Sequence, residues 1–105
     1  MFLTIVDRKM KEFGFVKLVA YNEKESVPVV CYERSVSRFT SFYVEAVPTN
    51  IGVQYQYTFY KKNHFKNELK FYCQEVPPRV VLYKIKFVFS SFLEHEILLD
   101  DLHWQ

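Results

Sequence analysis

The residue types that could hold a metal ion or move a proton gather near the C-terminus. Glu96, Asp100 and His103 fall at positions i, i+4 and i+7, and on a helix they would share one face, as a site of carboxylates and imidazole requires. The same residue types are common on solvated helix faces. We therefore predict a solvated polar face here, with no metal and no cofactor.

The other candidates for catalysis are Cys31, Cys73 and His64. Both cysteines lie in apolar, alternating segments, so we expect both thiols in the core, where burial raises a thiol pKa and makes the group inert. His64 lies in a predicted turn between basic residues, with no carboxylate nearby in sequence to orient its ring. With two glycines in the chain, a phosphate-binding glycine loop is excluded. We predict that the protein is not an enzyme.

Alternating apolar side chains predict strands along most of the chain. From Val53 to Phe59 the odd positions are apolar or aromatic and the even ones are polar, and residues 68–76 repeat the pattern with Leu69, Phe71 and Cys73 inward. Two prolines at 77 and 78 close that strand. Residues 79–89 are apolar on both faces, which predicts a further strand that is central or lies against something on its second side.

The two ends of the chain carry helix signals. Asp7 as an N-cap and Gly14 as the residue after the last turn predict a helix of one or two turns, or a loop, over residues 7–13. Residues 90–105 fit neither period cleanly, and Ser90 or Ser91 with Glu94 in the first turn favours a terminal helix.

About seven short strands joined by hairpin-like links predict an all-β fold, either an antiparallel β-sandwich or a small barrel, with a short helix at the C-terminus. A chain of 105 residues fits one domain, residues 1–105. Cys31 and Cys73 are then most simply reduced core residues. A disulfide is the alternative if their strands lie on facing sheets.

More apolar side chains are present than one inward face can hide. The segment 79–89 is apolar on both sides, and Phe39, Tyr43, Val47 and Val80 fall on nominal outer faces. Either the tail or another protein covers such a surface. We expect a non-enzymatic module that binds another protein, and also itself as a homodimer, through an outer sheet face with Tyr43, Tyr60, Tyr72 and Val80.

A basic and aromatic set of side chains supports an alternative function. If three consecutive strands form a meander, several of these side chains share one outer face, where rings that stack on bases and cations that follow phosphates would bind single-stranded nucleic acid. The same side chains also suit a solvated face with wet polar tips. The alternative is a small β-barrel that binds nucleic acid through Tyr60, Lys61, Lys62, Lys70, Tyr72, Lys84 and Lys86.

Charge and hydropathy bound the partners and the compartment. The net charge of +2 permits a polyanionic partner without implying one. The apolar opening, residues 2–6, is too short for a signal-peptide core or a membrane span, and the chain has no N-glycosylation sequon. We expect a cytoplasmic or nuclear protein with no membrane partner, although a mature secreted chain would have the same sequence.

Overall fold

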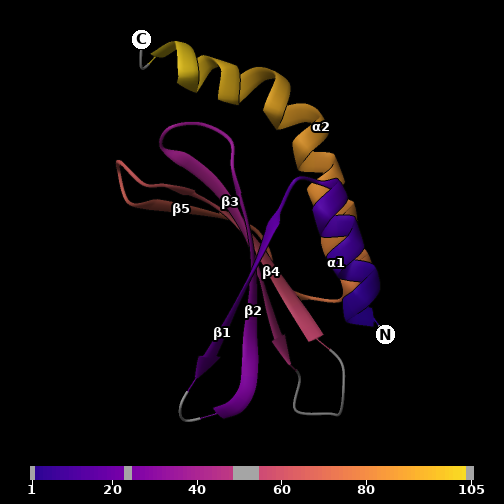
Figure 1. Cartoon of the computed structure of the whole chain (residues 1–105). Helices are drawn as coiled ribbons and strands as arrows, with labels where there is room; N and C mark the ends of the chain where they lie inside the picture. The colour runs from indigo at the N-terminus through magenta and orange to yellow at the C-terminus, as the bar shows by residue number, and fades with distance from the viewer. Residues whose placement is uncertain (1, 23–24, 49–54, 104–105) are drawn as a thin grey trace.

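The computed structural model describes residues 2–22, 25–48 and 55–103. In chain order the elements are α1 (Phe2–Glu12), β1 (Val16–Asn22), β2 (Glu25–Ser35), β3 (Thr40–Pro48), β4 (Tyr55–Asn63), β5 (Glu68–Val76) and α2 (Pro78–His103). The strands form one antiparallel sheet in the order β1-β2-β3-β4-β5. Both helices pack on the same face of this sheet, and the C-terminal half of α2 continues beyond its end (Figure 1).

The predicted antiparallel sheet is confirmed, but its closure was predicted wrongly. In place of a sandwich or barrel of about seven strands, the described residues form an open sheet of five strands. Two helices supply the second layer of the core, so one face of the sheet is covered without a second sheet (Figure 1).

The largest correction concerns residues 79–89, which were predicted as a strand and lie in helix α2. Val81, Ile85 and Val88 are buried at spacings of four and three, which is the stripe that a helix presents to a core. Val80, just before this stripe in sequence, and Tyr83, within it, are both exposed. A helix with apolar residues on two sides gives an almost continuous apolar run in the sequence. A strand buried on both faces gives the same run.

Pro77 and Pro78 were predicted only to end a strand, but they also lie at the start of α2. The carbonyl of Pro77 accepts hydrogen bonds from the N–H groups of Val80 and Val81, both at 3.1 Å. Pro78 takes the first helical position, where its missing N–H leaves no bond unmade. The prolines that end β5 therefore also begin the helix. Among the described residues, no helix is long and apolar enough to cross a membrane.

Helix α1 begins at Phe2, so the short helix predicted over 7–13 is a real helix with an earlier start. Gly14 follows it with φ of 88°, a conformation that L side chains rarely adopt. The N–H of Gly14 donates to Lys11 O at 3.0 Å, and the N–H of Phe15 donates to Met10 O at 2.9 Å. This pattern is a Schellman motif, and it confirms the predicted role of Gly14.

Aromatic rings join the sheet to α2. Phe42 of β3 and Phe59 of β4 have ring centroids 5.8 Å apart, and Phe89 of α2 lies 4.9 Å from the first and 6.1 Å from the second. Phe42 and Phe59 are fully buried. Such ring pairs stabilise a fold by about 0.5–1.5 kcal/mol each beyond the area that they bury.

Polar contacts fix α1 on the other half of the sheet. Asp7 accepts a hydrogen bond from the hydroxyl of Tyr32 in β2 and forms an ion pair with Lys17 of β1 at 2.7 Å. Arg34 Nη1 donates to the carbonyl of Phe13 at 2.7 Å, just after the end of α1. Burial, followed by the contact with Asp7, raises the pKa of Tyr32. The predicted N-cap Asp7 thus lies inside the helix and ties it to two strands.

Strand β2 and the first half of β5 alternate in the opposite phase from the one predicted. In β2, Val30 and Tyr32 face the helices, so Cys31 faces away from them. In β5, Leu69 and Phe71 are exposed, while Tyr72 and Cys73 pack against the core. The expectation of two core cysteines is therefore wrong for Cys31. Both thiols are free, so the disulfide alternative is not realised.

The helical assignment of residues 79–89 makes a sharp prediction. Tyr83 and Ile85 would share a face on a strand, but on α2 Ile85 is fully buried whereas Tyr83 is 72% exposed. We expect Ile85→Ala to lower the free energy of unfolding by about 2–5 kcal/mol. Tyr83→Ala should change it by about 0.5 kcal/mol or less. Urea denaturation measures both, and equal losses would contradict the helix.

Candidate protein-binding face

The face of the sheet that points away from the helices is called the open face here. Strand pairing places five of its side chains side by side across all five strands, because Glu33 pairs with Val16 and Tyr43, and Tyr60 pairs with Tyr43 and Phe71. This central row therefore runs Val16, Glu33, Tyr43, Tyr60, Phe71.

Three rings of the central row contact one another. The centroids of Tyr43 and Tyr60 are 5.4 Å apart with the ring planes at 23°, and those of Tyr60 and Phe71 are 5.2 Å apart at 41°. Cross-strand aromatic pairs of this kind stabilise a sheet. Because neighbouring ring faces are turned toward each other, the faces of the two tyrosines are partly occupied within the row.

The hydroxyl groups of these tyrosines also have partners on the open face. Tyr60 Oη donates to Glu45 Oε1 at 2.8 Å, and Tyr43 Oη lies 3.3 Å from His64 Nε2. Burial raises the pKa of Tyr43 to about 12, and the nearby Glu33 carboxylate adds to the effect. Burial and then the hydrogen bond to Glu45 raise the pKa of Tyr60. Both hydroxyls stay protonated at physiological pH.

Two further rows flank the central one and carry opposite charges. The row toward the β4–β5 turn, called the Lys62 row, contains Ser35, Ser41, Lys62 and Leu69. The row on the other side, called the Glu45 row, contains Leu18, Cys31, Glu45 and Thr58. The open face is therefore aromatic in the middle, basic on one side and acidic on the other.

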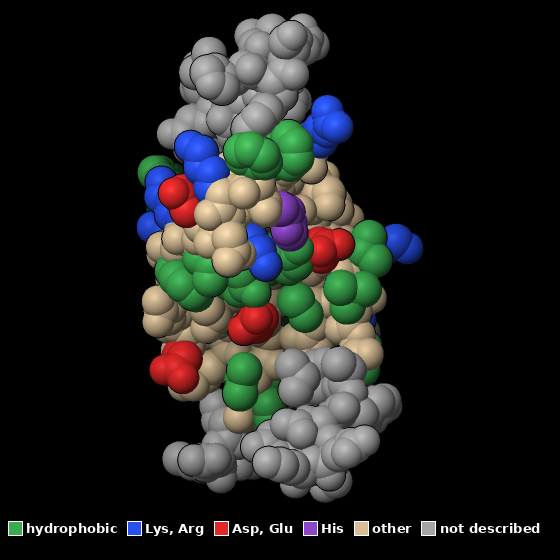
Figure 2. All heavy atoms as spheres, turned by 90° about the vertical axis from the view of Figure 1, so that its left-hand side faces the viewer, with side chains coloured by type: hydrophobic (Ala, Val, Ile, Leu, Met, Phe, Trp, Pro, Cys, Tyr) green, Lys and Arg blue, Asp and Glu red, His purple; other side chains and the backbone are tan. Residues whose placement is uncertain are grey.

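The apolar part of the open face is continuous. In Figure 2, apolar side chains form a band across this side of the molecule, with a few charged side chains set into it. Large apolar side chains that are about half exposed, Val16, Leu18, Val47, Leu69 and Phe71, lie in or beside the three rows. Contiguous exposed apolar surface of this kind marks interaction sites on soluble domains.

Cys31 lies in the Glu45 row and is half-buried. The pKa of its thiol is raised to about 11, first by burial and then by the nearby carboxylates of Glu45 and Glu33. A reactive cysteine needs a lowered pKa and a nearby cation. The local charges at Cys31 have the opposite sign, so this thiol is a poor nucleophile.

A serine and a histidine approach each other at the edge of the open face. His64 Nε2 lies 3.1 Å from Ser41 Oγ, the distance expected of a nucleophile and its base. The same nitrogen also contacts Tyr43, however, and Ser41 is buried and lies 3.1 Å from Ser35 Oγ. A buried hydroxyl cannot reach a substrate carbonyl, so we assign this cluster a structural role.

The residues predicted for protein binding separate into two groups. Tyr43 and Tyr60 lie side by side in the central row. Tyr72 lies on the helix side of the sheet, where its ring contacts Phe42 and Phe59. Val80 lies on α2 and is exposed there. The structure therefore brings two of the four predicted residues together.

The residues predicted for nucleic-acid binding are spread over three surfaces. Tyr60 and Lys62 lie on the open face, and Lys61, Lys70 and Tyr72 belong to the helix side of the sheet. Lys84 and Lys86 lie on α2. The outward meander face on which that alternative depends does not form.

A metal site needs several donor side chains close together. The described residues contain no group of three or more His, Cys, Asp or Glu that could hold a metal ion. Glu96, Asp100 and His103 belong to α2, but their side chains lie outside the described part of the chain.

Comparison with protein-family models, curated proteins and solved structures found no significant match to this chain. The assignment of the open face therefore depends on its geometry.

Sequence reasoning missed Phe71, Leu69, Cys31, Leu18 and Val16 as members of this face. The pairing of β4 with β5 shifts around Phe59, since Tyr60 pairs with Phe71 but Phe59 pairs with Cys73. One residue, Tyr72, is therefore extra, and residues on either side of it differ in phase. Glu75, which has φ of 51°, lies beside a second shift in the pairing of β5 with β4, between Tyr57 and Phe59.

The raised pKa of Cys31 can be tested directly. In a Cys73→Ser variant, the rate at which iodoacetamide alkylates Cys31 should rise with pH as the thiol loses its proton. We expect the midpoint of this rise at about pH 11 in the folded chain and at about pH 8.5 in denaturant. Between about pH 8.5 and about pH 11 the folded chain keeps a proton that the unfolded chain releases. The contribution of this thiol to stability is therefore lost as pH rises through that range. A folded midpoint near 8.5 would contradict the described environment.

Proposed function

We propose that this chain is a non-enzymatic protein-binding module whose open face packs against the open face of a second copy. The observation that carries the proposal is the central row, in which the half-buried rings of Tyr43 and Tyr60 contact each other and Tyr60 contacts Phe71, on a face that neither helix covers. Phe71, at one end of the row, is 47% exposed. Aromatic side chains are the residues most enriched in the cores of protein interfaces.

The charge pattern of the open face supports a second copy as the partner. A two-fold axis along the central row places the central row of one copy against the central row of the other. The strands of the two copies then run in opposite directions. The Lys62 row of one copy then covers the Glu45 row of the other, because the two rows lie on opposite sides of the axis. Facing sheets pack about 10 Å apart, a distance that a lysine and a glutamate can span together.

The exposed area is also consistent with a partner. The chain exposes 7592 Å² of surface, whereas a compact monomer of its mass exposes about 6,200 Å². This excess is larger than the roughly 800 Å² that each partner buries in a standard interface.

The open face suits a protein better than single-stranded nucleic acid. Base stacking needs free ring faces, but Tyr43 and Tyr60 stack on each other. Glu33 and Glu45 lie in or beside the row and would repel phosphates. Nucleic acid would also require the Lys61, Lys70 and Lys84 side chains, and these belong to the other side of the sheet or to α2.

The proposed interface predicts a face-specific loss of dimer. Phe71→Lys places a charge in the central row, and we expect it to raise the dimer dissociation constant at least tenfold, or about 1.4 kcal/mol. Phe87→Lys is the matched control, because Phe87 is 58% exposed on α2. Sedimentation equilibrium measures both. A strictly monomeric wild type, or equal effects, would contradict the dimer.

The proposed two-fold axis predicts a charge-reversal rescue. Lys62→Glu and Glu45→Lys should each weaken the dimer, because like charges then face each other across the interface. The double variant should bind more tightly than either single variant, since the charges of the Lys62 row and the Glu45 row that face each other are again opposite in sign. Glu45→Lys also removes the acceptor of the Tyr60 hydroxyl, so the decisive comparison is Lys62→Glu with the double variant. A double variant weaker than Lys62→Glu would contradict this axis.

A further inference from the structure

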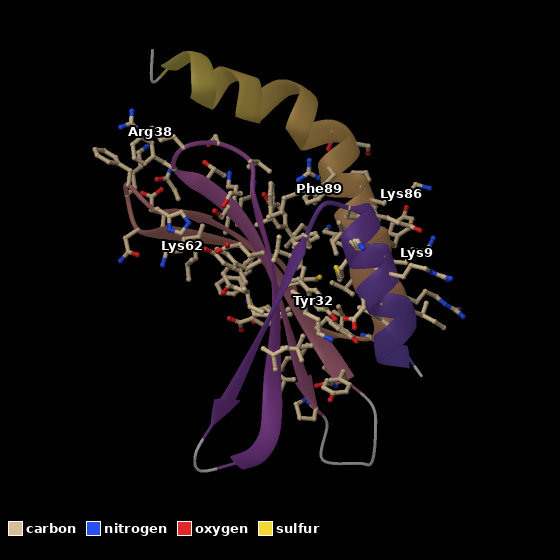
Figure 3. The ribbon with its side chains drawn as sticks, in the orientation of Figure 1. Lys9, Tyr32, Arg38, Lys62, Lys86 and Phe89 are labelled. Carbon is tan, nitrogen blue, oxygen red and sulfur yellow. The ribbon has the colours of Figure 1, made fainter. Side chains whose placement is uncertain are left out.

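The outer surface of the helix layer has a composition that the open face does not share. The turn of α1 that points away from the sheet carries Arg8 and Lys11, because Val6 and Met10 on the opposite side are buried. Lys9 of α1 and Lys86 of α2 both point away from the sheet on the same side of the molecule (Figure 3). Tyr32 and Phe89, in contrast, lie between the two layers (Figure 3).

An apolar stripe runs along the solvent side of α2. Val80, Tyr83 and Phe87 follow at spacings of three and four, opposite the buried stripe of Val81 and Ile85. All three are between 45% and 72% exposed. Helix α2 is therefore apolar on two opposite sides within its first three turns, and the sheet covers one of them.

Cations border this stripe. Residues 2–12 and 78–91 contain six Lys and Arg and two carboxylates, so these helical segments are more basic than the chain as a whole. Both carboxylates have cationic partners, since Asp7 pairs with Lys17 and Glu12 pairs with Lys9. On α2, Lys84 Nζ lies 5.8 Å from the centroid of the Phe87 ring.

We propose that the helix layer binds the surface of an anionic lipid bilayer, with Val80, Tyr83 and Phe87 entering the headgroup region and the surrounding lysines and arginines contacting lipid phosphates. Apolar side chains bordered by cations are the composition of interfacial helices. The sequence-based expectation of no membrane partner was drawn from the lengths of apolar runs, which bear on spanning and not on surface binding.

The aliphatic members favour a bilayer over nucleic acid. Ile5 and Val80 are about half exposed on the two helices. Side chains without a ring gain nothing from stacking on bases, whereas they gain from leaving water in a headgroup region. The proposal concerns the helix layer and does not depend on the function proposed for the open face.

Co-sedimentation with vesicles tests this proposal. The full chain is mixed with vesicles of phosphatidylcholine alone, or of phosphatidylcholine with roughly a third phosphatidylserine. We expect at least tenfold stronger partitioning onto the anionic vesicles at low salt, and weaker partitioning as salt rises. Equal partitioning onto both vesicles, or none, would overturn the proposal.

Variants locate the surface. Arg8→Gln with Lys11→Gln, and separately Tyr83→Ser with Phe87→Ser, should each lower partitioning about tenfold or more. The matched control is Arg38→Gln with Lys66→Gln, which removes one Arg and one Lys from strand-connecting turns and should change partitioning less than about twofold. Circular dichroism checks that each variant is folded. Equal loss of partitioning in the control variant would overturn the proposal. It would also be overturned if a labelled oligothymidine bound the helix layer and displaced the protein from the vesicles.

Discussion

The contact between α2 and the middle of the sheet is the interaction on which the rest of the structure depends. Phe89 packs against Phe42 and Phe59, and the stripe of Val81, Ile85 and Val88 lies along the same side of α2. Since α1 is fixed by Asp7 to β1 and β2, the two helices together cover one face of five strands. Because both helices are used on that face, the other is left for a partner or for water.

The strand content could be predicted from the sequence because alternation is a local signal. The segment from Tyr55 to Phe59 alternates cleanly, and Tyr57 and Phe59 are buried as the pattern required. The end of α1 was equally accessible, since Gly14 is one of two glycines and follows a helical run. Periodicity could not separate a helix with two apolar sides from a strand with two apolar faces, which is why residues 79–89 were misassigned.

The membership of the open face was harder to predict, because it depends on phase and not on period. In β2 the odd and even positions both carry apolar residues, so alternation alone does not say whether Cys31 or Tyr32 faces the core. In β5 the irregular pairing around Tyr72 reverses the phase within a single strand. Such a bulge is set by pairing with β4, and the β5 segment by itself does not encode it. Tyr43 and Tyr60 were placed correctly relative to each other because β3 and β4 pair without interruption.

The two surfaces proposed for binding lie on opposite sides of the molecule, and this restricts how they can act together. If two copies pack through their open faces, their helix layers point in opposite directions (Figure 1). A flat bilayer can then contact the helix layer of one copy but not of both. A dimer would therefore connect two bilayer surfaces, whereas a single copy would lie on one. Dimerisation and lipid binding would then not add their affinities on one membrane, because simultaneous engagement on one surface is geometrically forbidden.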